Sequence, residues 1–517
     1  MAEGAAVDIA RAMVAGPTPA GDWLAVLPVV LPLAGGALAL TLRERVRVQR
    51  ALGLAVLVVL LLVDAALLAR VVETGPVTMM MGRWLPPFGI AFTVDVLGAT
   101  LALTTAVVAL PAAIYAGVDI DAGARRFGFV PFLLILVGGV TGAFLTGDIF
   151  NLYVWFEVLL ISSFGLIVLG GEPRQLDGAV KYGVLNLVAT TLFLIATGYL
   201  YGLVGTLNMA DIVAAVRRLP ADAPIDAIAA LYLLAFGMKA AAFPVNFWLP
   251  ASYHTPRIVV AAVFAGLLTK VGVYALIRTL VMLMPAERLG LAGVIGWVAG
   301  LTMVVGALMA LAQSEIRRAL GFLVIAGIGA MLAGLAVGSE LALTGAILYA
   351  VHSMLAMTAI YLAVGAAERL TGTSSLNAAG GVWEESPLLA ALFLVLALAV
   401  AGLPPFSGFW PKLVLVKAAL AAGAGWLAAA ILVSGFLTTL ALGRIWLLAF
   451  WRPRPRPVAA AAPRPLEAAA ILPVAMLTVL VVLIGVAAEP LAAVAKAGAA
   501  GVIDPAAYIG SVFGEAP

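Results

Sequence analysis

Cysteine is absent from this 517-residue chain, and histidine occurs only twice, as His254 and His352. Without cysteine there can be no disulfide, no thiolate-bound iron–sulfur cluster and no covalently attached haem. Two histidines, one expected in a loop and one within a membrane span, also exclude a pair of bis-histidine haems. We therefore expect no cofactor and no metal site, and we do not expect the chain itself to carry electrons.

Charge is also scarce, because charged residues make up 11% of the chain and hydrophobic residues 64%. No water-soluble globular protein needs so much apolar surface, so the composition predicts a polytopic membrane protein. The net charge of +3 comes mostly from arginines in short loops, and it bears on membrane orientation rather than on nucleic-acid binding. A basic segment is missing from the first twenty residues, which include Glu3 and Asp8, so we expect no cleaved signal peptide.

Motifs of soluble catalysis are missing too. The sequence contains no Walker loop, no zinc signature and no nucleophile–base pair that stands out from background. A pump driven by ATP is therefore excluded for this chain alone. We expect a secondary transporter subunit rather than an enzyme.

Long apolar runs are what the sequence has in abundance. They predict an all-α protein of about fourteen transmembrane helices, centred near residues 32, 60, 104, 137, 160, 193, 238, 268, 300, 328, 352, 402, 435 and 478. Lysine and arginine are about twice as frequent in the connections on one side of the membrane as in those on the other side. Arg278 is counted in a connection on the side with fewer of them. Both termini are accordingly expected outside.

Two connections are longer than the others. Residues 207–225 have a helical apolar stripe with charges opposite, and we expect them to lie along the outer surface. Residues 452–466 are rich in proline and arginine and predict an extended linker. A loop that only sets topology is favoured there over a lipid-binding role.

Two spans combine a lysine with helix-breaking residues. In the first, Lys239 precedes Pro244, and in the second, Pro404 and Pro405 precede Lys412. Proline removes a backbone donor, and a broken helix beside a buried charge is how many transporters build ion sites. Five spans separate the two breaks, so the two units would have opposite orientations.

This arrangement predicts two inverted five-helix repeats. The expected division is 1–126 for helices 1–3, 127–284 for the first repeat, 285–451 for the second, and 452–517 for the basic linker, helix 14 and the C-terminal tail.

A lone carboxylate, Glu157, lies about nine residues inside the fifth span. One interpretation is a neutral acid that bonds to Ser162 or Ser163. The interpretation that we favour is a partner for Lys239, since isolated charges are costly at this depth. A nearby carboxylate would hold the lysine charged, and its withdrawal would favour release of a proton.

Further ionisable residues lie within spans. Lys270 is thirteen positions, about 20 Å of helix, beyond Arg257, too deep to reach the surface. His352 could relay protons because imidazole titrates near neutral pH, although a histidine bonded to a carbonyl or to Ser353 is nearly as compatible with the pattern. Lys417 is closer to the end of its span and is expected to extend to the surface.

Two aspartates within spans complete the inventory of intramembrane acids. Asp95 lies near a predicted helix start, and a structural role is favoured for it. The sequence suggests no role for Asp64.

At these residues the chain resembles a known family. The segments FLTGDIFNLYVWFEVLLISSFGL (144–166), LNLVATTLFLIATGYLYGLVGTLNMADI (185–212) and AFGMKAAAFPVNFWLP (235–250) resemble the antiporter-like subunits of respiratory complex I and of Mrp-type Na⁺/H⁺ antiporters. AGLLTKVGVYALIR and GLPPFSGFWPK extend the similarity to roughly residues 25–490. Within that superfamily, TGDIFNL, FEVLLISS, GTLNMADI and LTKVGVYALIR are most similar to the D subunits of Mrp complexes.

The resemblance implies fourteen helices, two inverted repeats and a line of polar residues along the membrane midplane. It implies that Glu157 and Lys239 correspond to the family's ion pair and Lys270 to its bridging lysine. His352 falls where the family has a polar residue between two half-channels, and Lys412 matches the terminal lysine. Some complex I subunits have glutamate at this last position, so Lys412 narrows the assignment without deciding it.

The resulting prediction is a proton-translocating subunit of a multisubunit Na⁺(cation)/H⁺ antiporter in a bacterial inner membrane. Its partners would be other hydrophobic subunits, a monovalent cation, protons and the lipid bilayer, and not nucleic acid. One alternative is a proton-pumping subunit of complex I or of a membrane-bound hydrogenase. Another is a structural scaffold with degenerate channels, against which the intramembrane Glu–Lys set argues.

Overall fold

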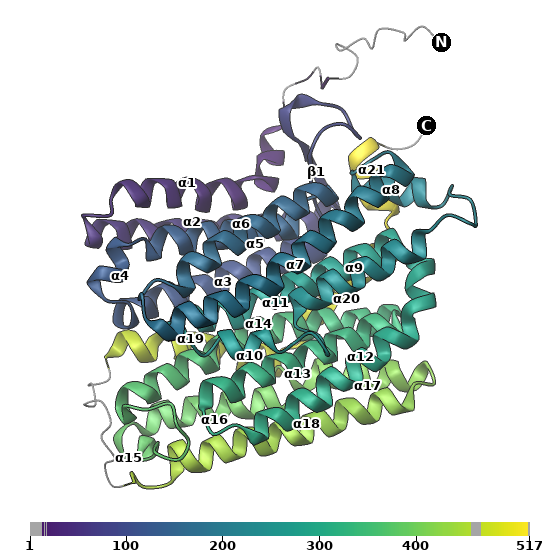
Figure 1. Cartoon of the computed structure of the whole chain (residues 1–517). Helices are drawn as coiled ribbons and strands as arrows, with labels where there is room; N and C mark the ends of the chain where they lie inside the picture. The colour runs from purple at the N-terminus through teal and green to yellow at the C-terminus, as the bar shows by residue number, and fades with distance from the viewer. Residues whose placement is uncertain (1–12, 15, 17, 456–466, 515–517) are drawn as a thin grey trace, which may run out of the picture.

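A computed structural model describes residues 13, 14, 16, 18–455 and 467–514 as a bundle of long, nearly parallel helices (Figure 1). In this part of the chain, ten helices are long and apolar enough to cross a membrane. They are α2 (Val46–Thr74), α3 (Val96–Asp119), α6 (Ile149–Ile167), α7 (Pro173–Val204), α11 with η4 (Ile258–Leu283), α12 (Pro285–Ala312), α13 (Ile316–Val337), α14 (Glu340–Thr371), α18 with η5 (Gly425–Trp451) and α19 (Ala468–Val486). The chain is a multi-pass membrane protein.

Shorter apolar helices complete the bundle. They are α1 (Leu27–Thr41), α5 (Phe129–Leu145), α9 (Ile225–Ala240) and α16 (Pro387–Ala401). Each of the fourteen predicted centres falls within one of these helices or, for residue 402, on the residue immediately after α16. The predicted helix positions are confirmed.

Both predicted breaks are present. Helix α9 ends at Ala240, and the chain resumes as the short α10 (Trp248–Ser252). Helix α16 ends at Ala401, and α17 (Phe409–Ala421) follows. In each case the first residue after the helix has left-handed backbone, with φ of 61° at Ala241 and 87° at Gly402, and a proline follows three residues later. A left-handed residue reverses the chain and proline supplies no amide hydrogen, so the helix cannot continue.

The same order of elements occurs twice. Helices α5, α6 and α7, the broken pair α9/α10, and α11 ending in the π-helical η4 (Ile277–Leu283) are followed by α12, α13 and α14, the broken pair α16/α17, and α18 ending in the π-helical η5 (Trp446–Trp451). This correspondence supports the division into repeats at 127–284 and 285–451, which stays a prediction.

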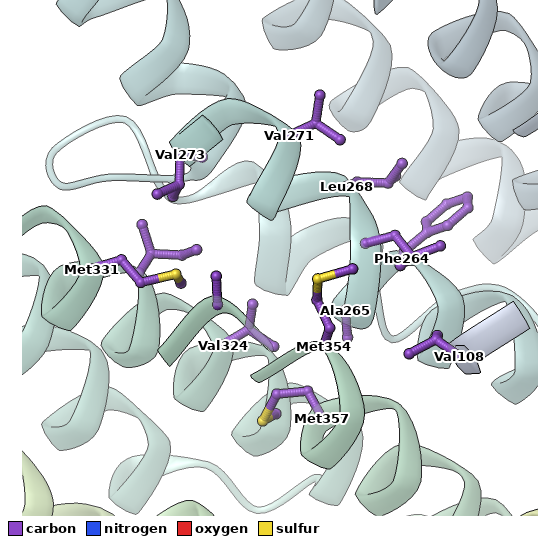
Figure 2. Close-up of a cluster of buried hydrophobic side chains, with 14 of the residues drawn as sticks. Val108, Phe264, Ala265, Leu268, Val271, Val273, Val324, Met331, Met354 and Met357 are labelled. Carbon is purple, nitrogen blue, oxygen red and sulfur yellow. The ribbon is translucent and has the colours of Figure 1, made fainter. Parts of the chain in front are cut away.

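The centre of the bundle is formed by α11 and α14, whose most apolar windows are wholly buried. Figure 2 shows side chains of four helices meeting around α11. They are Val108 from α3, Phe264, Ala265, Leu268, Val271 and Val273 from α11, Val324 and Met331 from α13, and Met354 and Met357 from α14. Lys270 and His352 belong to these two central helices, so the fold places them in its least hydrated region.

Smaller elements lie at the ends of the bundle. They are η2 (Ala20–Ala25), η3 (Met81–Arg83), the antiparallel strands β1 (Val77–Met80) and β2 (Ala91–Val94), α4 (Ala122–Arg126), α8 (Met209–Val216), α15 (Val382–Glu385) and α21 (Ala506–Phe513). Helix α20 (Glu489–Ile503) packs against α14 and α3 within the bundle. Helix α8 confirms a helix in the first part of the 207–225 connection. Of the predicted 452–466 linker, residues 456–466 lie outside the described residues, and Arg452 donates to the carbonyls of Leu376 and Ala379.

One loop assignment was wrong. Arg278 does not lie in an outer connection but within η4, where it is 1% exposed. Its Nη2 donates to Asp95 Oδ1 over 2.5 Å, and Asp95 also accepts the amide of Gly98 as the N-cap of α3. The structural role predicted for Asp95 is confirmed. The apolar run that contains Arg278 has the length of an ordinary membrane span. Its sequence did not indicate that its last turns are buried or that Arg278 pairs with a carboxylate there.

We predict that Asp95→Asn destabilises the protein strongly. Removing one partner of a buried pair leaves an uncompensated charge and costs about 3–5 kcal/mol. The measurement is the thermal unfolding midpoint of the purified protein in detergent. Asp177→Asn, which breaks the exposed pair with Lys181, is the matched control and should change the midpoint little. Equal shifts for the two variants, or no recovery when Arg278→Met is added to Asp95→Asn, would contradict this assignment.

Candidate functional site

Lys239 lies in the last turn of α9, immediately before the first break, and is 6% exposed. Its ammonium group has no hydrogen-bond partner among the described residues. The group lies over the ring of Phe156, whose centroid is 5.4 Å from Nζ. A cation over an aromatic face is stabilised by about 0.5–2 kcal/mol. A direct ion pair with a carboxylate would stabilise the buried ammonium group more. The structure thus holds this lysine in a poorly stabilised position.

Glu157 follows Phe156 on α6 and is half-buried. It is close enough for its charge to act on Lys239, but no ion pair within 4.0 Å joins the two in the part of the chain that is described. The predicted direct pair is therefore absent from this conformation. The alternative is not seen either, because Ser162 donates to the carbonyl of Val158 and Ser163 to that of Leu160.

Aromatic rings form the wall beside Lys239. Phe236, one turn before the lysine, contacts the rings of Phe156 at 5.8 Å, Phe193 at 4.7 Å and Tyr232 at 5.6 Å between centroids. The motifs in the sequence did not identify these rings as part of the site. Helical spacing was the available signal, since Tyr232 and Phe236 are four residues apart and share a face with Lys239.

Lys270 lies in the middle of α11 and is 1% exposed. Its Nζ donates over 2.5 Å to the carbonyl of Ala265, which is five residues earlier in the same helix. Two residues further, Gly272 contacts the end of α9, because a Cβ there would lie 2.7 Å from the amide nitrogen of Ala240 and 3.1 Å from the carbonyl carbon of Lys239. This close approach places the helix of Lys270 against the backbone of Lys239.

His352 lies in the middle of α14 and is 2% exposed. Its Nδ1 is 2.8 Å from Ser407 Oγ in the second break, and not bonded to Ser353. The charges of Lys270 and Lys412 both act on it. Gly408 leaves room for the imidazole ring, since a Cβ at this position would lie 2.8 Å from His352 Nε2. The imidazole therefore connects the central helices to the second broken helix.

Lys412 lies in the first turns of α17, and its side chain turns back to the other half of the broken helix. Nζ donates to the carbonyl of Val400 over 3.1 Å and to that of Ala401 over 2.6 Å. These are unsatisfied carbonyls at the C-terminus of α16, where a positive charge is stabilised by the helix dipole. Gly402 makes the contact possible, because a Cβ there would lie 2.5 Å from Lys412 Cδ.

The two breaks present an ammonium group at corresponding positions by different means. Counted from the left-handed residues Ala241 and Gly402, Lys239 corresponds to Val400. The first repeat carries its lysine at this position, whereas the second brings Lys412 to the same position from the opposite half-helix. Lys417 is exposed, as expected for a lysine near the end of its span.

The structure therefore places four of the five predicted site residues as a set on helices that pack against one another in the order α9, α11, α14 and α17. Gly272 brings the helix of Lys270 against the backbone of Lys239, and Ser407 joins His352 to the break that holds Lys412. Glu157 acts on one end of the set without a direct bond. Ser407, Phe156 and the glycines Gly272, Gly402 and Gly408 complete it. The sequence marked none of these as site residues, although GLPPFSG contains three of them within the second break.

Among the described residues, no group of three or more His, Asp or Glu side chains is placed to hold a metal ion.

Residues 146–438, more than half of the chain, match the family model described as NADH:quinone oxidoreductase/Mrp antiporter, transmembrane. The chain belongs to this family. It is 37% identical to a protein of Alkalihalophilus pseudofirmus named as the D subunit of a Na⁺/H⁺ antiporter, over 95% of this chain and 99% of that relative. It is 36% identical to the protein of the same name from Bacillus subtilis, over 84% of this chain and 88% of the relative.

Solved structures of family members have the same fold. A chain of the Mrp complex from Dietzia sp. DQ12-45-1b superposes with a TM-score of 0.90 at 30% identity, covering 95% of this chain and all of that one. A chain of respiratory complex I from Thermus thermophilus gives a TM-score of 0.80 at 25% identity, covering 93% and 99% of the two chains.

We predict that Gly402→Ala lowers transport in this family member more than Gly423→Ala does. Both glycines have positive φ, 87° and 72°, so each variant carries a similar backbone strain of about 1–2 kcal/mol. A Cβ at 402 displaces Lys412 from the carbonyls of Val400 and Ala401, whereas a Cβ at 423 meets no atom within 4 Å. The measurement is cation-dependent ΔpH collapse in inverted vesicles at equal complex content. Equal activity of the two variants would contradict a role for the Lys412–carbonyl contact.

Proposed function

We propose that this chain is the proton-translocating subunit of a multisubunit monovalent-cation/proton antiporter in a bacterial inner membrane, corresponding to the D subunit of Mrp complexes. The two relatives that carry this name as Na⁺/H⁺ antiporter components cover most of the chain and support the assignment. The superposable chain from the Mrp complex of Dietzia supports an assembly with other membrane subunits. The chain is then a transporter subunit and not an enzyme.

Protons would follow the connected set of basic residues. They would be taken up near Glu157 and Lys239, pass Lys270 and His352, and leave near Lys412. The observation that carries this proposal is the position of His352, whose Nδ1 is bonded to Ser407 in the second break. The helix of His352, α14, packs on α11, and α11 in turn lies against the first break, so the imidazole is between the two broken helices. Neutral imidazole accepts a proton on one nitrogen and donates from the other, which is the property that a relay needs.

The first step would depend on the distance between Glu157 and Lys239. The arrangement with the ammonium over Phe156 and without a hydrogen-bond partner would be the one from which the proton is released. A rotation that brings the carboxylate into contact would favour the charged form. The conformation described here corresponds to the separated arrangement, and the contact arrangement would complete the cycle.

Membrane orientation follows from the arginines. Contacts join the arginine-rich ends of α1, α3, α11 and α14 on one side. Arg126 on α4 pairs with Glu44, Arg257 pairs with Asp121, and Arg369 donates to the carbonyl of Val118. We assign this side to the cytoplasm. Both termini then lie outside, and the two five-helix units at 127–284 and 285–451 have opposite orientations. The identical order of their elements supports the repeat.

A redox-driven complex is the second candidate function, favoured by the similarity to a chain of complex I from Thermus thermophilus. The two functions differ in what drives proton movement. In inverted vesicles that contain the whole complex, an antiporter dissipates a preset ΔpH when Na⁺, K⁺ or Li⁺ is added. A redox-driven subunit instead requires an electron donor and shows no cation response.

We predict that Glu157→Gln abolishes most of the cation-dependent ΔpH collapse. The amide cannot exchange a proton with Lys239, and positioned proton-transfer groups contribute about 10²–10⁴-fold to rate. Vesicles are energised to a fixed ΔpH by an independent pump, and complex content is matched by immunodetection. Glu73→Gln, at an exposed glutamate near the end of α2, is the control and should transport like the wild type.

Two results would overturn parts of the proposal. A Glu157→Gln variant with the wild-type cation response would remove Glu157 from the route while keeping the antiporter. A Lys239→Ala variant that still transports normally would favour a structural scaffold with degenerate channels.

A further inference from the structure

The loop that interrupts the second broken helix is packed on both sides. On one side, Ser407 is bonded to His352 of α14 over 2.8 Å. On the other side lies the last turn of α19, where a Cβ at Gly485 would overlap the carbonyl oxygen of Pro405 and lie 2.6 Å from Phe406 Cα. The loop is therefore held between the helix that carries His352 and the end of α19.

A tryptophan side chain fastens the same region to α19. Trp410, in the first turn of α17, donates its indole N–H to the carbonyl of Gly485 over 2.7 Å. Gly485 thus contacts the break twice, through the space left by its missing side chain and through its carbonyl oxygen. Helix α19 also packs along α14 and α16, so it lies against both the helix of His352 and the first half of the broken helix.

The tryptophan that follows the first break has a different partner. Trp248 donates over 3.0 Å to the carbonyl of Met238 in the last turn of α9, so it joins the two halves of its own broken helix. At the second break Lys412 makes the contact between the halves, because its Nζ bonds to the last carbonyls of α16, and Trp410 bonds to α19 instead. The first break is closed by its own side chain, whereas the second also depends on another helix.

A lysine that takes part in proton transfer is a variable link between two half-helices. A hydrogen bond from a charged donor is about twice as strong as one from a neutral donor. In the proposed transport function Lys412 alternates between these two forms, so the link between α16 and α17 would weaken in one of them. The bond between Trp410 and Gly485 joins an indole N–H to a peptide carbonyl, neither of which titrates near neutral pH. It would therefore hold α17 equally in both states.

We propose that α19 acts as a clamp on the second break, with Gly485 and Trp410 as its positioning residues. The clamp keeps Ser407 against His352 while the charge of Lys412 changes. Its effect on transport rests on the proposed function, but its effect on the loop does not, and the two can be measured separately.

Gly485→Ala and Gly501→Ala form a matched pair for the effect on the loop. Both glycines are helical, but a Cβ at 485 overlaps the break, whereas a Cβ at 501 meets no atom within 4 Å. Hydrogen–deuterium exchange of the purified whole complex is followed by mass spectrometry in peptides that cover residues 403–412. We expect Gly485→Ala alone to raise exchange there, because the loop amides lose their fixed positions. Unchanged exchange in Gly485→Ala would overturn the clamp, whatever the complex transports.

Trp410→Phe tests the effect on transport, because it keeps an aromatic ring and removes the indole N–H. Trp426→Phe is the control, since Trp426 is 45% exposed, compared with 39% for Trp410, and stacks on Trp297 of α12. Cation-dependent ΔpH collapse is recorded over a range of pH in inverted vesicles with equal complex content. We expect Trp410→Phe to lower the maximal rate about tenfold and to change its pH dependence, since a 1 Å misplacement can cost about 10²-fold. The apparent KM for the cation should stay unchanged. A wild-type rate and pH dependence would contradict the positioning role.

A double variant shows whether Trp410 acts through Ser407. If it does, Ser407→Ala/Trp410→Phe transports no more slowly than Ser407→Ala alone, whereas independent losses would multiply. Multiplied losses would refute the clamp as a device for the relay and leave Trp410 a general stabilising residue. If the wild-type complex shows no cation response, the antiport function fails, and the same variants are compared by donor-driven proton movement. Failure of the clamp and failure of the proposed function are thus distinguished.

Discussion

Keeping ammonium groups inside a membrane protein without fixed counter-ions is the constraint on which this structure depends. Insertion scales assign about 2.5–3.5 kcal/mol to a lysine at the centre of a helix that spans a membrane. Lys270 and Lys412 donate to backbone carbonyls, and Lys239 lies over an aromatic ring. Such contacts reduce the cost of burial, but none of them commits the lysine to remaining charged. The surrounding helices must therefore be shaped to supply carbonyls and rings where a carboxylate would normally be found.

The breaks in α9 and α16 are the main means of supplying these groups. An intact helix satisfies its own carbonyls, whereas an interrupted one leaves its last carbonyls available inside the bundle. At the second break these carbonyls receive Lys412, and the following loop presents Ser407 to His352. Glycine at 402 and 408 lets the side chains approach the backbone. The interruptions are therefore part of the site and not defects tolerated around it.

Much of the fold could be predicted from the sequence because membrane spans are long and their apolar character is continuous. The fourteen centres and both breaks followed from hydropathy and proline alone. The site was predicted as residue types in the right helices, since a buried lysine is conspicuous in an apolar run. Its contacts were not predictable. Whether Lys239 meets Glu157 or Phe156 depends on rotamers of adjacent residues on α6, and the partner of His352 comes from 55 residues further along the chain. Arg278 was misassigned because arginine near the end of a span usually reaches the surface.

Arginines and lysines inside the bundle have different partners. Arg278 is paired with Asp95 and the partly buried Arg317 with Glu368, whereas the buried Arg288 donates to the carbonyls of Leu335 and Ala336. No guanidinium loses its proton under physiological conditions. Such pairs are permanent and suit the frame that holds the helices together. The three lysines within the bundle have no carboxylate within 4.0 Å in the described part of the chain. A lysine paired as firmly as Arg278 would remain charged and could not pass a proton on. The same scarcity of partners that makes these lysines costly to bury is what the proposed proton route requires, because each lysine on it must be able to hold and to release a proton.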